Sequence, residues 1–395
     1  MLFKILNSGD FLSNTQASDY ESGSKSFLNK ISEKGLRYDL TVPFARYVVM
    51  NQNEISFPFK RFQIQPVWRA DRPQKGRYRE FYQCDADVVG TKSLLCEAEI
   101  IVMINEVFDK LGLKDFTIKI NNRKILEGFT DAIGASGKES QFCVAIDKLD
   151  KIGKEKVIEE LVSKGFDENS LESLEPIFET GKSLNETISF LEELFAKDSI
   201  GEQGLTEVKQ ILEMLNYFGK GDFNLQLDLT LARGLSYYTG AIFEVKANGV
   251  QMGSICGGGR YDNLTGVFGL KDVSGVGISF GVDRIYDVME ELDLFPKSNE
   301  ADLQVMMVNF GDEYSAYNIK ALSKLRESGI NSELYPDDSK LKKQFNYANK
   351  RGVPFVVIVG EEEIKAERYV LKDMTTGEQS SYKLDDLISK ILNSQ

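Results

Sequence analysis

An arginine beside a glycine interrupts an apolar and aromatic run between Leu231 and Gly240, LARGLSYYTG, which continues as AIFEV. The bulky and branched residues of this segment predict a strand: Leu231, Leu235, Tyr237, Ile242, Phe243 and Val245. A full positive charge in such a setting needs an anionic partner. The segment therefore predicts that Arg233 binds an anion.

A triple glycine, Gly257-Gly258-Gly259, leads to a second arginine and the letters RYDNL. Because glycine has no side chain, such a run lets the backbone approach a ligand closely. A plain β-bulge is the alternative.

A strand, a basic loop and a second strand are predicted between Phe59 and Asp87. From Lys60 to Arg79 the only acid is Asp71, and the cations are Lys60, Arg61, Arg69, Arg72, Lys75, Arg77 and Arg79. An arginine at the strand end can hold one phosphate of a nucleoside triphosphate while the cationic loop closes over the others. A solvated basic face is the alternative.

Three polar residues, Gln83, Asp85 and Asp87, alternate along the second of these strands and so share one face. A face with only amide and carboxylate groups is not apolar core. Beside the arginine-rich loop it suggests a pocket for a cationic substrate, and plain exposure to solvent is the alternative.

The segments resemble the motifs of the histidyl-tRNA synthetase family, a class II aminoacyl-tRNA synthetase family. That family has RGLDYYTG where this chain has RGLSYYTG, with Asp at the position of Ser236, and GGGRYDGL where this chain has GGGRYDNL. The segment from Phe59 to Asp87 resembles class II motif 2, and GISFGVDRI, from Gly277, resembles motif 3. LRYDLTVPFAR, from Leu36, resembles a further segment of the family; alone, it would suggest a strand end with a turn at Pro43.

The resemblance implies a role for each matching residue. Arg233 and Arg69 would be catalytic, with Arg69 at the α-phosphate and the substrate carboxylate. Histidine would be bound by Asp39, Leu40, Thr41, Arg69, Gln83, Asp87, Arg233, Tyr237 and Tyr238, with Asp87 at the imidazole. ATP would be bound by Arg69, Asp71, Arg77, Phe81 and Arg284. Taken alone, Phe81 would be a core aromatic and Arg284 a surface residue.

The resemblance implies an ATP-dependent histidine–tRNA ligase. ATP would be the second substrate, Mg²⁺ would accompany the pyrophosphate, and tRNA-His would receive the histidyl group. A homodimer and a cytoplasmic location are expected, with no protein metal site. The rival is a regulatory paralogue of the type that serves ATP phosphoribosyltransferase without charging tRNA. The family also has a block containing motif 1 ahead of Leu36, and we expect this chain to lack most of it.

Composition restricts the chemistry that the chain can perform. None of the 395 residues is a histidine, so Ser/His/Asp and Cys/His arrangements, imidazole bases and His-based zinc sites are excluded. The net charge of −13 argues against non-specific nucleic-acid binding over the whole surface. Cys84, Cys96, Cys143 and Cys256 have no C-x-x-C spacing, and no apolar run approaches the about 20 residues of a membrane span.

Together with the elements that must position these residues, the resemblance implies an α+β fold with an antiparallel catalytic sheet, a helical insertion and a C-terminal α/β domain that is similar to an anticodon-binding domain. We expect the catalytic domain in 1–120 and 221–297, the insertion in 121–220 and the anticodon-binding domain in 301–395. Helices are predicted at 93–111, 282–291, 314–328 and 341–350. Strands are predicted at 61–65, 82–89, 224–245, 275–280, 303–308, 353–359 and 369–372, and a loop at 13–26.

Overall fold

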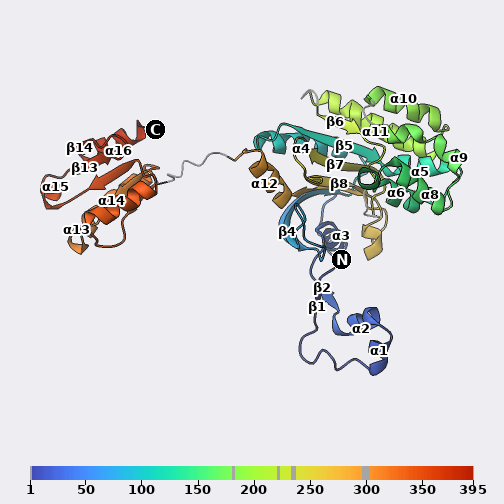
Figure 1. Cartoon of the computed structure of the whole chain (residues 1–395), viewed down its shortest axis with the longest axis horizontal. Coiled ribbons are helices and arrows are strands. Elements are labelled where there is room, and N and C mark those ends of the chain that lie inside the picture. The colour runs from blue at the N-terminus through green and yellow to red at the C-terminus, as the bar shows by residue number, and fades with distance from the viewer. Residues whose placement is uncertain (1, 180–182, 220–222, 233–236, 296–302, 395) are drawn as a thin grey trace. The chain divides into compact units, whose positions relative to one another are not determined.

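The computed structural model describes residues 2–179, 183–219, 223–232, 237–295 and 303–394. The chain divides into two compact units, Met1–Leu294 and Phe295–Gln395 (Figure 1). Arg233, Leu235 and Ser236 lie outside the described residues.

A seven-stranded sheet forms the centre of the first unit, in the order β3-β4-β9-β8-β7-β5-β6. Every pairing in it is antiparallel except that of β5 with β6. The strands are β3 (Phe59–Trp68), β4 (Glu80–Val89), β5 (Phe116–Asn122), β6 (Leu225–Leu227), β7 (Ala241–Ala247), β8 (Cys256–Tyr261) and β9 (Gly275–Gly281). The predicted antiparallel sheet is therefore confirmed.

Alternation along β4 gives this sheet one apolar face and one functional face. Cys84, Ala86 and Val88 pack into the main core with α4 (Leu95–Lys110) and α12 (Val282–Glu291). On α4, Phe108 meets Phe280 of β9 with ring centres 6.1 Å apart. The opposite face of the sheet carries a smaller core formed with α3 (Thr41–Met50) and η2 (Thr265–Phe268). The two predicted helices, 93–111 and 282–291, are confirmed.

A helical insertion lies between β5 and β6, and Figure 1 shows it as a green cluster. It comprises α5 (Arg123–Ala132), α6 (Glu139–Ile146), α7 (Leu149–Ile152), α8 (Lys154–Ser163), α9 (Glu168–Glu172), η1 (Glu175–Phe178), α10 (Leu184–Leu194) and α11 (Ile200–Tyr217). Helices α5 and α11 pack closely because Gly128 faces Gly201. A Cβ on Gly128 would lie 2.5 Å from the Gly201 Cα.

Two segments differ from their predicted structure. Residues 13–26 were expected to be a loop, but they contain α1 (Ala17–Glu21) and the start of α2 (Ser24–Ile31). The Asp19 carboxylate accepts from the Gln16 backbone N–H and so closes the first turn of α1. Nearby, β1 (Lys4–Ile5) pairs with β2 (Lys34–Gly35).

The prediction that Leu231 and Tyr237 belong to a strand is wrong, because β7 begins only at Ala241. The Asn121 side-chain amide donates to the carbonyls of Leu229 and Leu231, at 3.3 and 3.0 Å. These carbonyls therefore bond to a side chain rather than to a neighbouring strand. The helix beginning at Thr41 likewise replaces the alternative of a strand end with a turn at Pro43.

The second unit contains a five-stranded sheet in the order β11-β10-β12-β13-β14. Its strands are β10 (Val305–Met307), β11 (Ser332–Leu334), β12 (Phe355–Ile358), β13 (Tyr369–Asp373) and β14 (Gln379–Tyr382). Its helices are α13 (Asp312–Glu327), α14 (Leu341–Lys350), α15 (Glu361–Lys365) and α16 (Leu384–Leu392). This α/β architecture was predicted and is confirmed. Across both units, no helix in the described part of the chain has the length and apolar character needed to cross a bilayer.

Candidate active site

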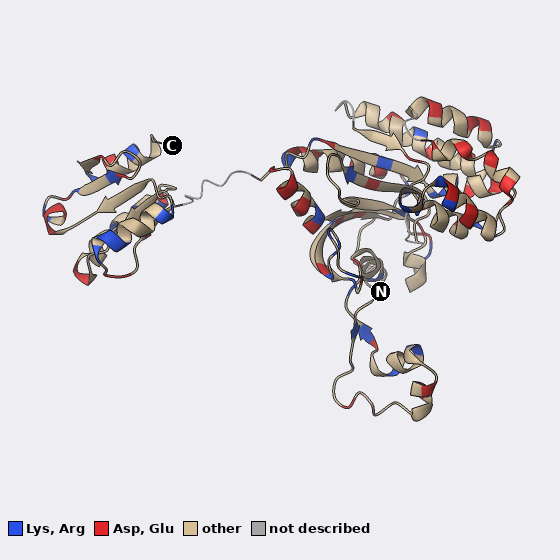
Figure 2. Ribbon diagram, in the orientation of Figure 1, with Lys and Arg blue, Asp and Glu red and all other residues tan. Residues whose placement is uncertain are grey.

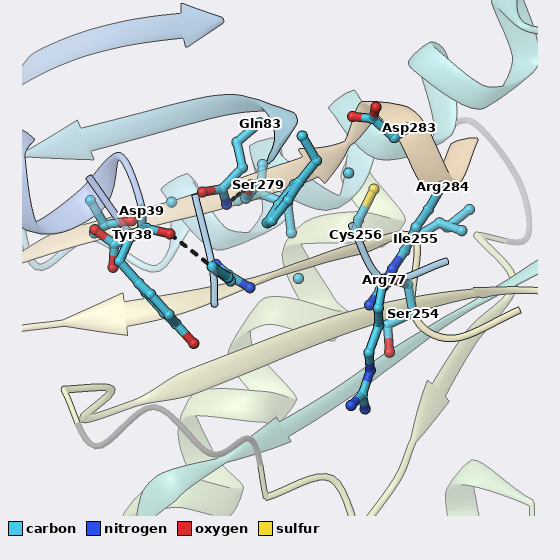
Figure 3. Close-up of a pocket in the computed structure, with 18 of the residues that line it drawn as sticks. Tyr38, Asp39, Arg77, Gln83, Ser254, Ile255, Cys256, Ser279, Asp283 and Arg284 are labelled. Carbon is cyan, nitrogen blue, oxygen red and sulfur yellow. Dashed lines mark hydrogen bonds between the residues drawn. The ribbon is translucent and has the colours of Figure 1, made fainter. Parts of the chain in front are cut away.

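A cavity of about 380 Å³ opens on the face of the sheet that carries the polar residues of β4 (Figure 3). The predicted site residues on its wall are Asp39, Thr41, Arg69, Asp71, Arg77, Phe81, Gln83, Asp87, Tyr237, Tyr238 and Arg284. Leu40 is fully buried and lies outside this wall. The structure thus brings together residues that are far apart in the sequence.

Arg69 follows the last residue of β3 and lies between two aromatic rings. Its guanidinium carbon is 4.4 Å from the ring centre of Tyr38 and 5.0 Å from that of Phe81. Its Nε donates to the Tyr38 carbonyl at 3.2 Å. These contacts fix the plane of the guanidinium, and a fixed planar fork suits a carboxylate or a phosphate.

Asp87 has two buried partners that the sequence analysis did not assign to the site. The Arg61 Nη2 lies 2.8 Å from the Asp87 Oδ2, and the Tyr261 hydroxyl donates to Oδ1 at 2.7 Å. Arg61 is held in turn by the Phe44 ring, whose centre is 4.1 Å from its guanidinium carbon, and by the Leu40 carbonyl at 3.2 Å. The carboxylate is therefore rigidly oriented at the base of the cavity.

Asp39 precedes α3, and its side chain accepts from the Val42 backbone N–H at 3.2 Å. Burial raises the pKa of Asp39, while the Val42 hydrogen bond and the charge of Arg69 partly offset that effect. Tyr237 packs on Tyr238 with ring centres 4.7 Å apart, and burial holds the pKa of its hydroxyl well above the ordinary value. Two tyrosine rings and the Asp39 carboxyl group thus share this part of the cavity.

Arg284 lies in the first turn of α12 and is fixed by two backbone carbonyls. Its Nε donates to the Gly76 carbonyl and its Nη1 to the Ser254 carbonyl, each at 2.6 Å. The first contact ties the basic loop to α12. Figure 3 shows Arg77 and Arg284 together in one part of the pocket, with Tyr38, Asp39, Gln83 and Ser279 in another. The cavity therefore has a cationic part and a part rich in hydrogen-bond acceptors.

The floor of the cavity depends on glycines in β8 and β9. A Cβ on Gly258 would lie 2.0 Å from the Gly277 carbonyl oxygen, and a Cβ on Gly277 would lie 2.0 Å from the Asp87 Oδ1. At 2.0 Å a Cβ would clash, so the backbone of β9 or the Asp87 carboxylate would have to move. The triple glycine is therefore required by close packing as well as by access to the cavity.

The arginine of the same motif has a different role. Arg260 points to the other face of β8 and is 5% exposed. Its Nε and Nη2 donate to the two carboxylate oxygens of Glu97 on α4, at 2.5 and 2.6 Å. This buried bidentate pair links β8 to α4 and does not line the cavity.

Asp85 is the most deeply buried carboxyl of the polar face, at 1% exposure. Burial, and next the nearby charge of Asp87, raise the pKa of Asp85 to about 7. Burial also raises the pKa of Asp87, to about 6, against the opposing charge of Arg61. The folded protein therefore holds protons that the unfolded chain has already released above about pH 4.

Because the folded state binds more protons, the stability of the ligand-free protein should fall as pH rises from about 4 through 7. We expect a loss of the order of 1–3 kcal/mol between pH 5 and pH 8. Trp68 is the only tryptophan and lies at the end of β3, so its fluorescence during urea unfolding reports on this unit. Asp85→Asn should flatten the dependence, and an unchanged slope in this variant would assign the effect to other groups.

The model of the histidyl-tRNA synthetase family matches residues 18–285, and that of an anticodon binding domain matches residues 303–394. The chain is 56% identical to the histidine–tRNA ligase of Cytophaga hutchinsonii over 392 residues, covering 99% of this chain and 86% of the relative. The histidine–tRNA ligase of Phocaeicola vulgatus is 55% identical, with the same coverage of both chains.

A solved structure supports the same relationship. The histidyl-tRNA synthetase of a Nostoc species superimposes with a TM-score of 0.80 and 33% identity, covering 91% of this chain and 84% of that one.

Proposed function

The chain belongs to the histidyl-tRNA synthetase family, and we propose that it activates L-histidine with ATP and transfers the histidyl group to tRNA-His. The observation that carries this proposal is that one cavity brings together Asp39, Arg69, Gln83, Asp87 and Arg284. Its acceptor-rich part suits the ammonium and imidazole groups of histidine. Its cationic part suits the phosphates of ATP.

In the first step a carboxylate oxygen of histidine attacks the α-phosphorus of ATP, and the bond to the bridging oxygen of pyrophosphate breaks. We propose that Arg69 neutralises charge on the α-phosphate, with Arg233 as the second catalytic cation. Arg77 and Arg284 would bind the outer phosphates, while Asp71 and Phe81 would contact adenine. Catalysis of this kind consists of positioning and charge neutralisation.

We propose that Mg²⁺ would accompany the phosphates of ATP and would supply positive charge beside Arg77 and Arg284. Within the described ranges there is no cluster of three or more acidic or thiol ligands that could form a protein cage for a metal. Binding through phosphate oxygens and water suits Mg²⁺, which keeps much of its hydration shell. Asp283, beside Arg284 on the cavity wall, could accept hydrogen bonds from such water.

In the second step a ribose hydroxyl of the 3′-terminal adenosine of tRNA attacks the histidyl carbonyl, and AMP leaves. We propose that 1–120 with 221–297 performs both steps, that 121–220 is an accessory insertion and that 301–395 binds the anticodon region. We propose a cytoplasmic location, where histidine, ATP and tRNA are available.

The tRNA contact of the second unit is proposed to involve α14. Its exposed cations are Lys342, Lys343 and Lys350, and the exposed residues Lys340 and Arg351 flank its two ends. Figure 2 shows the blue segments along this helix. Replacing Lys342 and Lys343 together by glutamate should weaken tRNA binding. The slope of log affinity against log salt should fall by about 1 for each phosphate that the variant no longer neutralises. Filter binding over a salt series measures both effects.

Lys320→Glu with Lys324→Glu on α13 makes the same charge change on another exposed helix of this unit. This control should weaken tRNA binding less. Equal effects of the two double variants would mean that net charge alone, rather than α14, governs binding.

A homodimer is proposed because β3 forms an edge of the described sheet and carries exposed apolar residues. Phe62 is 77% exposed and Ile64 is 54% exposed. In a dimer, the outer edge of this strand would pair with, or pack against, a second copy of the chain. Sedimentation velocity over a concentration series tests this proposal, and a monomer at all concentrations would contradict it.

Two measurements together test the overall function: histidine-dependent exchange of pyrophosphate into ATP, and charging of tRNA-His. We expect the protein to perform both reactions. The regulatory alternative predicts ligand binding with neither reaction, and the identity above 50% with two histidine–tRNA ligases over nearly the whole chain favours the enzyme.

A further inference from the structure

A short hydrogen-bonded relay joins three side chains of β4 and β9 at the acceptor-rich part of the cavity. The Gln83 Nε2 donates to the Ser279 Oγ at 2.6 Å. Ser279 lies directly opposite Asp85 in the antiparallel ladder, and the two side chains are hydrogen-bonded. Gln83 and Asp85 are 8% and 1% exposed, so water has little access to these two side chains, whereas Ser279 is half-buried on the cavity wall.

The chemistry of the three groups fixes the direction of each bond. An amide nitrogen only donates, so Ser279 must accept from Gln83 and keeps one hydrogen for another partner. Burial raises the pKa of Asp85 to about 7, and in its ionised form, above that pH, the carboxylate only accepts and takes that hydrogen. As a result the Gln83 amide is held in one of its two orientations, with its nitrogen on Ser279.

This orientation leaves the Gln83 Oε1 as a buried acceptor that has no hydrogen-bond partner within the described residues. Gln83 belongs to the cavity wall, and Figure 3 shows it beside Ser279, in the same part of the pocket as Asp39. A buried acceptor without a partner raises the free energy of the folded protein, because it has lost its hydrogen bonds to water. A ligand that donates a hydrogen bond to it removes this penalty.

The ligand group must be a donor, which excludes the carboxylate of histidine. The imidazole has Asp87 as its proposed partner, whereas an ammonium group carries three donors and can use both Asp39 and Gln83. We propose that Asp85 and Ser279 are positioning residues that orient the Gln83 amide to accept from the α-ammonium group of histidine. The relay would make the site selective for an α-amino group, an inference that rests on the proposed function.

Removing one member of the relay should lower the affinity only for ligands that carry the ammonium group. In Ser279→Ala the Gln83 amide loses its anchor and can present nitrogen to the cavity. Calorimetric titration of the full chain should show about tenfold weaker binding of L-histidine. Binding of 3-(imidazol-4-yl)propionate, which lacks the amino group, should stay within about twofold of the parent value, because it makes no contact with Gln83 Oε1.

Three further variants define the relay. Ser279→Thr keeps the hydroxyl and should retain selectivity, whereas Asp85→Ala breaks the relay from its other end and should reproduce the loss. Cys84→Ala is the matched control, because Cys84 lies between Gln83 and Asp85 on the opposite face of β4. It should leave the ratio of the two affinities unchanged.

Unimpaired binding of the propionate by a variant also shows that the variant is folded. Equal weakening of both ligands in Ser279→Ala and Asp85→Ala, or no weakening of either, would overturn the relay while leaving the ligase function intact. Failure of the parent chain to bind histidine or to exchange pyrophosphate would instead overturn the proposed function.

Discussion

Replacing Arg233 by alanine should lower histidine-dependent ATP–pyrophosphate exchange about 10²–10³-fold at saturating substrates, with a smaller change in KM. The chain has no histidine, so no imidazole of the protein can stabilise charge that develops on the α-phosphate. A guanidinium can do so without reorganising. Arg233 lies outside the described residues, but the Arg123 Nη1 holds the preceding Ala232 carbonyl at 2.9 Å.

Two variants accompany this measurement. Arg233→Lys should recover only part of the rate, because a point charge cannot reproduce a planar fork. Arg46→Ala removes an exposed arginine of α3 and should leave the rate near that of the parent. Near-normal exchange by Arg233→Ala at saturation would make Arg233 a structural residue and strengthen the regulatory alternative.

Asp87→Ala should weaken histidine binding at least about 100-fold, because it removes the proposed imidazole acceptor and leaves the Arg61 charge buried without its partner. The side chain of Arg61 is only 9% exposed. ATP affinity should change only a few-fold, since the cationic part of the cavity is separate. Isothermal titration with each ligand measures the two effects.

Asp87→Asn separates loss of charge from loss of shape. Its amide oxygen can still accept from the Tyr261 hydroxyl, so the fold around β4 should persist while histidine binding stays weak. Equal weakening of histidine and ATP in both variants would contradict a specific role for Asp87.

Sequence patterns predicted the strands and helices that are specified by residues close together in the chain. The β3 and β4 strands follow from alternation on either side of a polar loop that contains Pro73 and Gly76, and α12 and α14 follow from helical periodicity. The strand prediction for the segment from Leu231 was wrong because the Leu231 carbonyl accepts from Asn121, a residue more than a hundred positions away. No local pattern contains that contact.

The same distinction applies to the site. Residues on the cavity wall were predicted from motif resemblance, because each motif is contiguous. Arg61 and Tyr261 were not assigned roles, although Arg61 stands directly opposite Asp87 in the ladder between β3 and β4. Such roles arise from strand register, and periodicity in one strand does not reveal which residue of the next strand lies beside it.

The facing glycines of β8 and β9 limit how this pocket could be redesigned. Because Gly258 and Gly277 leave no room for even a methyl group, directed evolution cannot reshape the floor by adding side chains there. A change of amino-acid specificity would have to come from the walls, through positions such as Gln83, Asp87 and Tyr237. A mutant library for that purpose should keep both glycines fixed and place its diversity at the walls.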